Sequence, residues 1–230
     1  MFGLSFHPYG LFIGLGILAA FEASVRLSKV RGIDRKLIES LFWWVIICGI
    51  FGARLYHVID KWNTIYSISP KSVLYIWNGG LGIWGAIIGG VVGLLGYWVI
   101  KLRRKISFLY LMDVAVIGVP LGQAIGRWGN FFNNEIVGRS GEPLFLYESL
   151  LNLLLFGILI IIGRMGRIGL ITGTYLVGYG LIRFALEPLR PDIIVWKIAG
   201  IPTAMIFSAL AIAFGILIIL KNRSISHFRV

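Results

Sequence analysis

The chain has 230 residues, of which 58% are hydrophobic and only 14% are charged, and its mean hydropathy is +0.87. A soluble domain carries about a quarter of its residues as charged side chains, so this composition excludes an ordinary soluble globular protein. The net charge of +12 does not indicate nucleic acid binding, because basic residues collect in the cytoplasmic loops of membrane proteins.

Seven apolar runs are long enough to be transmembrane helices. In chain order they cover residues 8–26, 40–59, 82–100, 110–126, 145–162, 168–186 and 202–220. The first basic residue, Arg26, follows the first run, so that run is not expected to be a cleavable signal peptide. We predict an all-α membrane protein with about seven transmembrane helices, forming a single integral membrane domain over residues 1–230.

The loops indicate the orientation of these helices. Segments 26–36, 101–105, 164–167 and 221–229 hold fourteen of the 22 lysines and arginines, and they follow the first, third, fifth and seventh runs. The positive-inside rule makes that side cytoplasmic. We therefore expect the N-terminus outside and the C-terminus in the cytoplasm.

Five arginines depart from this charge distribution. They lie at or near the predicted outer ends of the runs: Arg54, Arg127, Arg139, Arg183 and Arg190. A charge at such a depth costs about 3 kcal/mol on insertion scales. A planar guanidinium can bind a phosphate or carboxylate through two parallel hydrogen bonds. The excess of arginine therefore indicates an anion-binding site on the outer side.

Glycines at intervals of four residues predict close helix packing. Two such series occur, Gly85, Gly89 and Gly93, and Gly118, Gly122 and Gly126. Small residues at this spacing let helix backbones approach each other in lipid. We infer no chemistry from them.

Two outer segments precede the densest polar stretch. The first is His7-Pro8-Tyr9-Gly10, where Tyr9 has the alternative role of an interfacial aromatic residue. The second is W-N-G-G-L-G-I-W-G at residues 77–85. Its glycines, Gly79 and Gly80 among them, predict close approach by another helix or a lipid.

The densest polar stretch is G-R-W-G-N-F-F-N-N-E-I-V-G-R at residues 126–139. Its glycines at 126, 129 and 138 argue against a regular helix. Non-helical backbone near membrane depth is tolerated where it is buried in protein or faces water. The stretch can present guanidiniums, side-chain amides and backbone N–H groups to one anion.

A further polar stretch covers residues 179–192. Arg183 and Glu187 are four residues apart and share a helix face. Pro188 and Pro191 should end that helix. We expect Glu187 to hold Arg183 in place rather than to act as an acid or base.

Residues 126–138 resemble the signature G-R-x-x-N-F-x-N-x-E-x-x-G of the prolipoprotein diacylglyceryl transferase family, and every specified position is filled. The run Arg183…Glu187…Arg190-Pro-Asp resembles a second motif of the family, and Tyr9-Gly10 resembles a third. Together with the chain length and the predicted spans, the resemblance covers nearly the whole chain.

The resemblance implies an enzyme of the prokaryotic cytoplasmic membrane with its active site on the outer side. It would transfer the diacylglyceryl group of phosphatidylglycerol to the lipobox cysteine of a prolipoprotein signal peptide and release glycerol phosphate. It implies no cofactor and no metal. The implied catalytic residues are Arg127, Arg183, Asn130, Glu135 and Tyr9, and the implied substrate-binding residues are Gly138, Arg190, Glu187, Asn133, Tyr179, Gly79 and Gly80.

The reaction needs a thiolate, and a free cysteine ionises near pH 8.5. Arginines near the thiol would stabilise its anion, and arginines would also stabilise the phosphate leaving group. We assign these two tasks to Arg127 and Arg183, with Arg190 steering the anionic headgroup. Asn130 and Tyr9 would orient glycerol or phosphate oxygens. Glu135 either fixes an arginine or accepts the thiol proton.

One position departs from the family pattern. Many members have histidine in a stretch like G-G-x-x-x-H-G, where this chain has Trp84. None of the histidines, His7, His57 and His227, is an obvious replacement. A mechanism that requires a histidine at this position cannot operate here.

Three other functions are alternatives for this sequence. A lipid or anion transporter would also place arginines in a helix bundle, but it predicts a polar path through both leaflets. An intramembrane protease needs a serine–histidine pair, two aspartates or a zinc motif in the bundle. A family relative that binds phosphatidylglycerol without catalysis is the third, because of Trp84.

Overall fold

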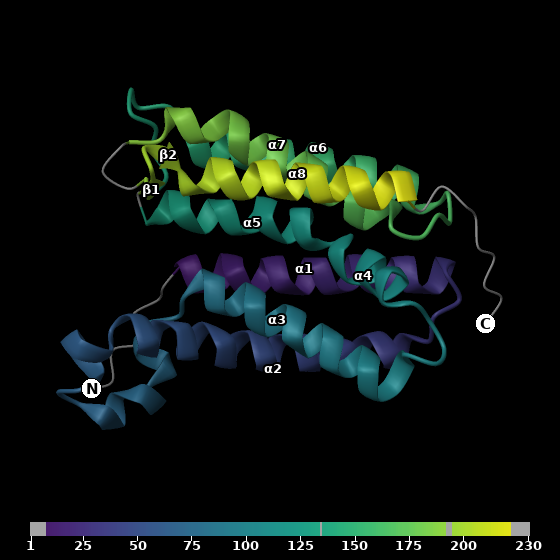
Figure 1. Cartoon of the computed structure of the whole chain (residues 1–230), viewed down its shortest axis with the longest axis horizontal. Helices are drawn as coiled ribbons and strands as arrows, with labels where there is room; N and C mark the ends of the chain where they lie inside the picture. Colours follow the sequence, from purple (N-terminus) through teal and green to yellow (C-terminus); the bar gives the residue numbers. More distant parts are fainter. Residues whose placement is uncertain (1–7, 134, 192–194, 222–230) are drawn as a thin grey trace. The chain divides into compact units, whose positions relative to one another are not determined.

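The computed structural model describes residues 8–133, 135–191 and 195–221. Its main elements are helices (Figure 1): α1 (Pro8–Val30), α2 (Arg35–Asp60), α3 (Ile83–Tyr97), α4 (Phe108–Val116), α5 (Val119–Phe132), α6 (Leu144–Gly163), α7 (Leu170–Leu186) and α8 (Thr203–Lys221). The predicted all-α fold class is confirmed. The short helical turns are η1 (Trp62–Tyr66), η2 (Pro70–Leu74), η3 (Ile76–Asn78), η4 (Trp98–Leu102) and η5 (Glu187–Leu189). A small antiparallel pair, β1 (Lys197–Ile198) and β2 (Ile201–Pro202), precedes α8.

The chain divides into two compact units. One unit, Ile33–Leu111, contains α2 and α3, which pack against each other. The other, Met1–Gly32 with Met112–Val230, contains α1 and α5 to α8. In this larger unit α5 packs against α1 and α6, α6 against α7, and α7 against α8. The single membrane domain stays a prediction.

In the described part of the chain, six helical segments are long and apolar enough to cross a membrane. They correspond to α1, α2, α3 with η4, α4 with α5, α6 and α8. The remaining predicted run, 168–186, contains α7, which has 17 residues. The protein is an integral membrane protein, and the count of seven spans and their orientation stay predictions.

Glycine packing sets the spacing of the helices, as the sequence predicted. A Cβ on Gly122 would lie 3.0 Å from the Gly16 carbonyl oxygen, so α5 and α1 touch backbone to backbone. In the smaller unit, a Cβ on Gly89 would collide with the Cys48 carbonyl group of α2. Backbone contact of this kind requires residues without a side chain.

The predicted span 110–126 lies within one segment that is long and apolar enough to cross a membrane, Phe108–Phe132. This segment consists of α4 and α5, which are separated at Gly118 where the chain lies against Ala20 of α1. The irregular backbone predicted from Gly126 is wrong as far as Phe132, because α5 continues to that residue. Gly126 and Gly129 serve helix packing instead, against Ile13 and Tyr9 of α1.

A buried aspartate joins three elements of the larger unit. Asp113 of α4 accepts hydrogen bonds from the backbone N–H groups of Gly169 (2.7 Å) and Thr172 (2.9 Å) at the start of α7. It also accepts from the Thr172 hydroxyl at 2.7 Å and pairs with Arg31 at 3.2 Å. The side chains of Asp113 and Arg31 are 0% and 4% exposed, so this charge is stabilised by its partners and not by water.

Replacing Asp113 by Asn should therefore destabilise the protein by about 3 kcal/mol, because it removes the negative charge that is paired with the buried Arg31 guanidinium. Thermal unfolding in detergent should show a clearly lower Tm. The control is Glu39→Gln, which removes a carboxylate from an exposed pair with Arg35 and should change the Tm little. Equal shifts for the two variants would contradict the proposed role of Asp113.

Candidate active site

Three arginines of the larger unit converge on one carboxylate, Glu148 of α6. Arg127 of α5 pairs through Nε with Glu148 Oε2. Arg183 of α7 donates from Nη1 to Glu148 Oε1 at 3.1 Å, and Arg190 donates from Nη2 to the same oxygen at 2.8 Å. The sequence-predicted arginines 127, 183 and 190 are thus brought together, although they come from different elements.

A second carboxylate completes the cluster. Glu187 accepts a hydrogen bond from Arg183 Nη2 at 2.7 Å, and its Oε2 lies 3.6 Å from Arg190 Nε. The expected pairing of Glu187 with Arg183 is confirmed. Three guanidiniums and two carboxylates leave one unit of positive charge.

The carboxylates lie deeper than the guanidiniums. The side chains of Glu148 and Glu187 are 0% and 5% exposed, whereas those of Arg127, Arg183 and Arg190 are 21%, 16% and 16% exposed. Among the described residues, Arg127 Nη2 and Arg190 Nη1 donate no hydrogen bond. The accessible part of the cluster is therefore cationic and retains N–H donors for an anion.

The signature amides extend from this cluster. Asn130 is 7% exposed, accepts from Arg127 Nη1 at 3.2 Å and donates to Glu135 at 2.7 Å. Asn133 donates to the other Glu135 oxygen at 3.2 Å. Glu135 thus orients Asn130, which in turn contacts Arg127. Of the two roles left open for Glu135, the contacts favour fixing an arginine, through Asn130.

The loop after α5 is tied to the end of α7. The Arg139 N–H donates to the Leu189 carbonyl oxygen at 2.9 Å, and its guanidinium contacts the Arg190 carbonyl oxygen at 3.2 Å. In the same loop, the Gly138 N–H donates to the Glu142 carbonyl oxygen at 2.8 Å. Ile136 has a φ of +59°, a conformation that is strained for a β-branched residue.

Two predicted tyrosines lie on helices of the same unit. A Cβ on Gly129 would be 3.0 Å from Tyr9 Cδ2, so the Tyr9 ring lies on α5 beside the signature. Tyr179 lies one helical turn before Arg183 and stacks on Tyr175, with ring centroids 5.7 Å apart. The Tyr175 hydroxyl accepts from Gln123 at 3.1 Å.

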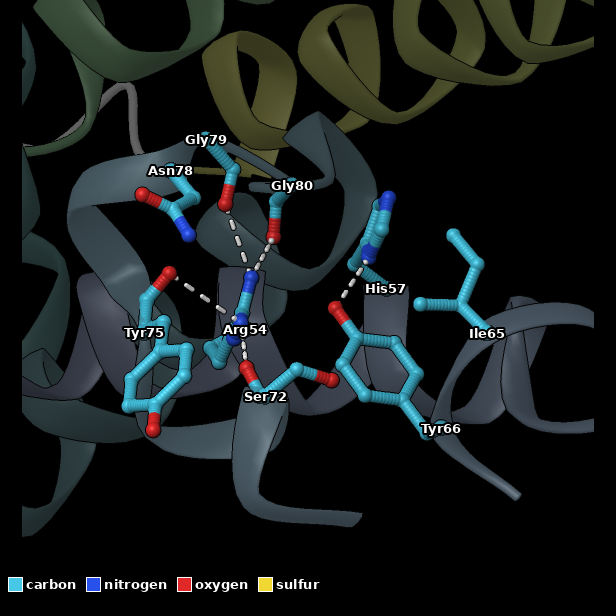
Figure 2. A pocket seen from close by; sticks show the side chains of 9 residues that line it. All are labelled: Arg54, His57, Ile65, Tyr66, Ser72, Tyr75, Asn78, Gly79 and Gly80. Carbon is cyan, nitrogen blue, oxygen red and sulfur yellow. Dashed lines mark hydrogen bonds between the residues drawn. The ribbon is translucent and has the colours of Figure 1, made fainter. Parts of the chain in front are cut away.

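Gly79 and Gly80 lie in the smaller unit, and their carbonyl oxygens accept hydrogen bonds from Arg54 (Figure 2). Arg54 is 9% exposed and donates to the carbonyl oxygens of Val73, Gly79, Gly80, Ser72 and Tyr75. A guanidinium has five N–H donors, so these bonds occupy it. The interpretation of Arg54 as part of an anion site is wrong. It holds the loop that follows α2 in place.

The sequence reasoning missed Glu148. Its signal was an acidic residue, with Ser149 and Asn152, inside the apolar run 145–162, where an ionisable side chain is costly and usually paired. The motif positions His7, Asn134 and Asp192 lie outside the described residues. No group of three or more potential metal ligands occurs in the described segments.

Comparison with known proteins gives one family. The family model described as "Prolipoprotein diacylglyceryl transferase" matches residues 1–221. Relatives named phosphatidylglycerol–prolipoprotein diacylglyceryl transferase include that of Synechococcus elongatus, 39% identical over 93% of this chain and 82% of the relative. Those of Finegoldia magna (34% identical) and Clostridium novyi (36% identical) are covered over 94% and 93% of their lengths.

Gly138→Ala should disturb the loop between α5 and α6. A Cβ there would overlap the Glu142 side chain, which now accepts from the Ser140 N–H at 3.0 Å. Hydrogen bonds from its own N–H and from Ser140 hold the pKa of the Glu142 carboxyl below its usual value of 4.5. In Gly138→Ala this pKa should rise towards 4.5, as a carboxyl-carbon NMR titration would measure.

The matched control is Gly157→Ala in α6, where a Cβ would meet nothing within 4 Å. It should leave the Glu142 titration unchanged. An unchanged titration in Gly138→Ala as well would show that Gly138 is not required for this loop conformation.

Proposed function

Because the chain belongs to the prolipoprotein diacylglyceryl transferase family, we propose that it transfers the diacylglyceryl group of phosphatidylglycerol to the lipobox cysteine of prolipoproteins. The chain is an enzyme of lipoprotein maturation. We place its active site at the arginine cluster and on the outer side of the bacterial inner membrane. The convergence of Arg127, Arg183 and Arg190 on Glu148 is the observation that carries this assignment.

The reaction is a displacement at the glyceryl carbon that bears the phosphate ester. The thiolate sulfur forms a C–S bond, the C–O bond breaks, and glycerol phosphate leaves with the electron pair. Negative charge grows on the leaving phosphate oxygen, and donors positioned in advance stabilise it. The cluster supplies such donors together with one unit of positive charge.

Each arginine has a distinct contribution in this proposal. Arg127 and Arg183 stabilise the leaving phosphate and the thiolate, and Arg190 steers the anionic headgroup. Asn130 and Tyr9 orient glycerol or phosphate oxygens. Glu148 and Glu187 are positioning residues, because they are buried behind the guanidiniums and fix their orientation.

The activity is tested with purified protein, phosphatidylglycerol and a lipobox peptide, by following peptide mass and glycerol phosphate release. Arg127→Ala should abolish the diacylglyceryl mass shift. A wild-type protein that binds phosphatidylglycerol without any mass shift would instead be a binding-only relative.

Arg127→Lys and Arg183→Lys test the need for planar, forked donors. Each should lower kcat by about a hundredfold, because an ammonium keeps the charge but lacks the planar fork that forms two parallel hydrogen bonds with one phosphate. Arg26→Lys is the control, since Arg26 forms an exposed pair with Glu22. Near-wild-type kcat in both lysine variants would remove the argument for guanidinium geometry.

Glu148→Gln tests whether Glu148 acts by positioning the arginines or by changing the attraction of the cluster for the anionic lipid. The variant raises the net charge of the cluster, so binding of phosphatidylglycerol should be retained. The kcat should fall at least about a hundredfold, because the amide has no negative charge and only one acceptor oxygen to hold three guanidiniums. Lipid binding is measured by native mass spectrometry, with Glu22→Gln as control. Parallel loss of binding and kcat would contradict a positioning role.

A further inference from the structure

One helical turn away from the arginine cluster, α5 and α6 each carry a side-chain amide. Gln123 precedes Arg127 by four residues, and Asn152 follows Glu148 by four, so each amide shares a helix face with a member of the cluster. Asn152 is 0% exposed. A fully buried amide in an otherwise apolar helix is costly unless its hydrogen bonds are made.

The register of the two helices sets these amides opposite each other. Glu148 pairs with Arg127, and the hydroxyl of the next residue in α6 donates to the Ala124 carbonyl oxygen, three residues earlier in α5. Later residues of α6 therefore face earlier residues of α5, so the helices are antiparallel. One turn beyond the Arg127–Glu148 pair, the facing residues are Gln123 and Asn152.

Tyr179 of α7 lies at the same level. Arg183 contacts the cluster carboxylate of α6 at 3.1 Å, and a Cβ on Gly178 would collide with the Leu155 side chain, farther along α6. The helices α6 and α7 are thus antiparallel as well. Tyr179 precedes Arg183 by one turn, and this register sets it opposite Asn152. We call Gln123, Asn152 and Tyr179 the amide layer.

The N–H groups of the two amides have partners, but their oxygens do not. Gln123 donates from Nε2 to the Tyr175 hydroxyl at 3.1 Å, and Asn152 donates from Nδ2 to the Glu148 carbonyl oxygen at 2.8 Å. Gln123 Oε1 and Asn152 Oδ1 are both buried and accept no hydrogen bond from the described residues. Proteins leave few buried acceptors without a donor. Two such oxygens at one level indicate a ligand that donates hydrogen bonds.

We propose that the amide layer binds the glycerol headgroup of phosphatidylglycerol while the arginines bind its phosphate. This inference rests on the proposed function. The two headgroup hydroxyls donate to Gln123 Oε1 and Asn152 Oδ1. One helical turn is about 5.4 Å, a separation that the glycerol spans from its phosphate ester. The cluster and the amide layer can therefore bind one lipid together.

This arrangement makes the amide layer a determinant of headgroup specificity. A headgroup without hydroxyls would leave both buried oxygens unpaired, and sites built for a hydroxyl strongly reject an analogue that lacks it. A cationic headgroup such as ethanolamine would lie one turn from three guanidiniums, which repel it. The site thus favours a neutral headgroup with hydroxyl donors.

The test lets phosphatidylglycerol and phosphatidylpropanol compete at equal concentration in the same micelles, with a lipobox peptide as acceptor. Phosphatidylpropanol keeps the charge of the phosphodiester and lacks both headgroup hydroxyls. The ratio of released glycerol phosphate to propyl phosphate reports the ratio of the two kcat/KM values, and it does not depend on the fraction of folded enzyme. Wild type should favour phosphatidylglycerol at least about a hundredfold.

Asn152→Leu and Gln123→Leu each replace an amide by an apolar side chain. Each should lower the product ratio at least about tenfold, because one hydrogen bond to the headgroup is lost. The release of propyl phosphate should change little. Ser149→Ala is the matched control, since its hydroxyl lies on the same helix as Asn152 and already donates to the Ala124 carbonyl oxygen at 3.0 Å. It should keep the wild-type ratio.

The outcomes separate this inference from the proposed function. A wild-type protein that releases neither phosphate contradicts the proposed function itself. Release of both phosphates without a preference overturns the headgroup site alone and assigns the two amide oxygens to water. A wild-type preference that Asn152→Leu and Gln123→Leu both retain also overturns it, because a structural role slows the two lipids equally.

Discussion

The candidate site depends on one ion cluster, in which the buried carboxylate of Glu148 holds three arginines together. Guanidiniums repel one another strongly where little water is present, and arginine cannot lose its charge to relieve that repulsion. Glu148 is fully buried, so its negative charge is directed to the arginines and not to solvent. With Glu187 as the second acceptor, the arrangement keeps one unit of positive charge on the accessible side. This unit of positive charge is complementary to the single negative charge of a phosphodiester.

The helix packing decides whether this cluster can form. Arg127 is carried by α5, Glu148 by α6 and Arg183 by α7, so the distances among them follow from the spacing of three helices. Glycines set part of that spacing, since α5 lies on α1 through Gly122 and Gly16, and Gly129 accommodates the Tyr9 ring. Arg190 reaches Glu148 by a different route. The chain leaves α7 through η5, which contains Pro188, and then extends at Arg190. The turn η5, with Pro188, therefore places the third guanidinium.

Much of this could be predicted from the sequence, for reasons that are local. Except for the fourth run, the long apolar runs predicted the helices to within a few residues, and the spacing of Arg183 and Glu187 predicted their ion pair. The irregular backbone predicted at Gly126 was wrong because glycine has two effects in a membrane helix. It can interrupt the regular backbone, or it can let a neighbouring helix pack closely, and the sequence does not distinguish these effects. Glu148 was missed because its partners Arg183 and Arg190 lie 35 and 42 residues away. No periodic pattern links residues at such separations.

The two environments of these arginines show why their number alone could not define the site. The N–H groups of Arg54 donate to backbone carbonyl oxygens of its own unit. Its charge is therefore stabilised by backbone dipoles, and no N–H group remains for a ligand. Carboxylates neutralise part of the charge on Arg127, Arg183 and Arg190. A carboxylate balances a full positive charge but accepts hydrogen bonds from only some of the N–H groups of the guanidiniums. A carboxylate thus restrains a guanidinium and still leaves N–H groups for substrate. Arginine holds a loop in one unit and, in our proposal, binds an anion in the other, and the acceptor that the guanidinium faces makes the difference.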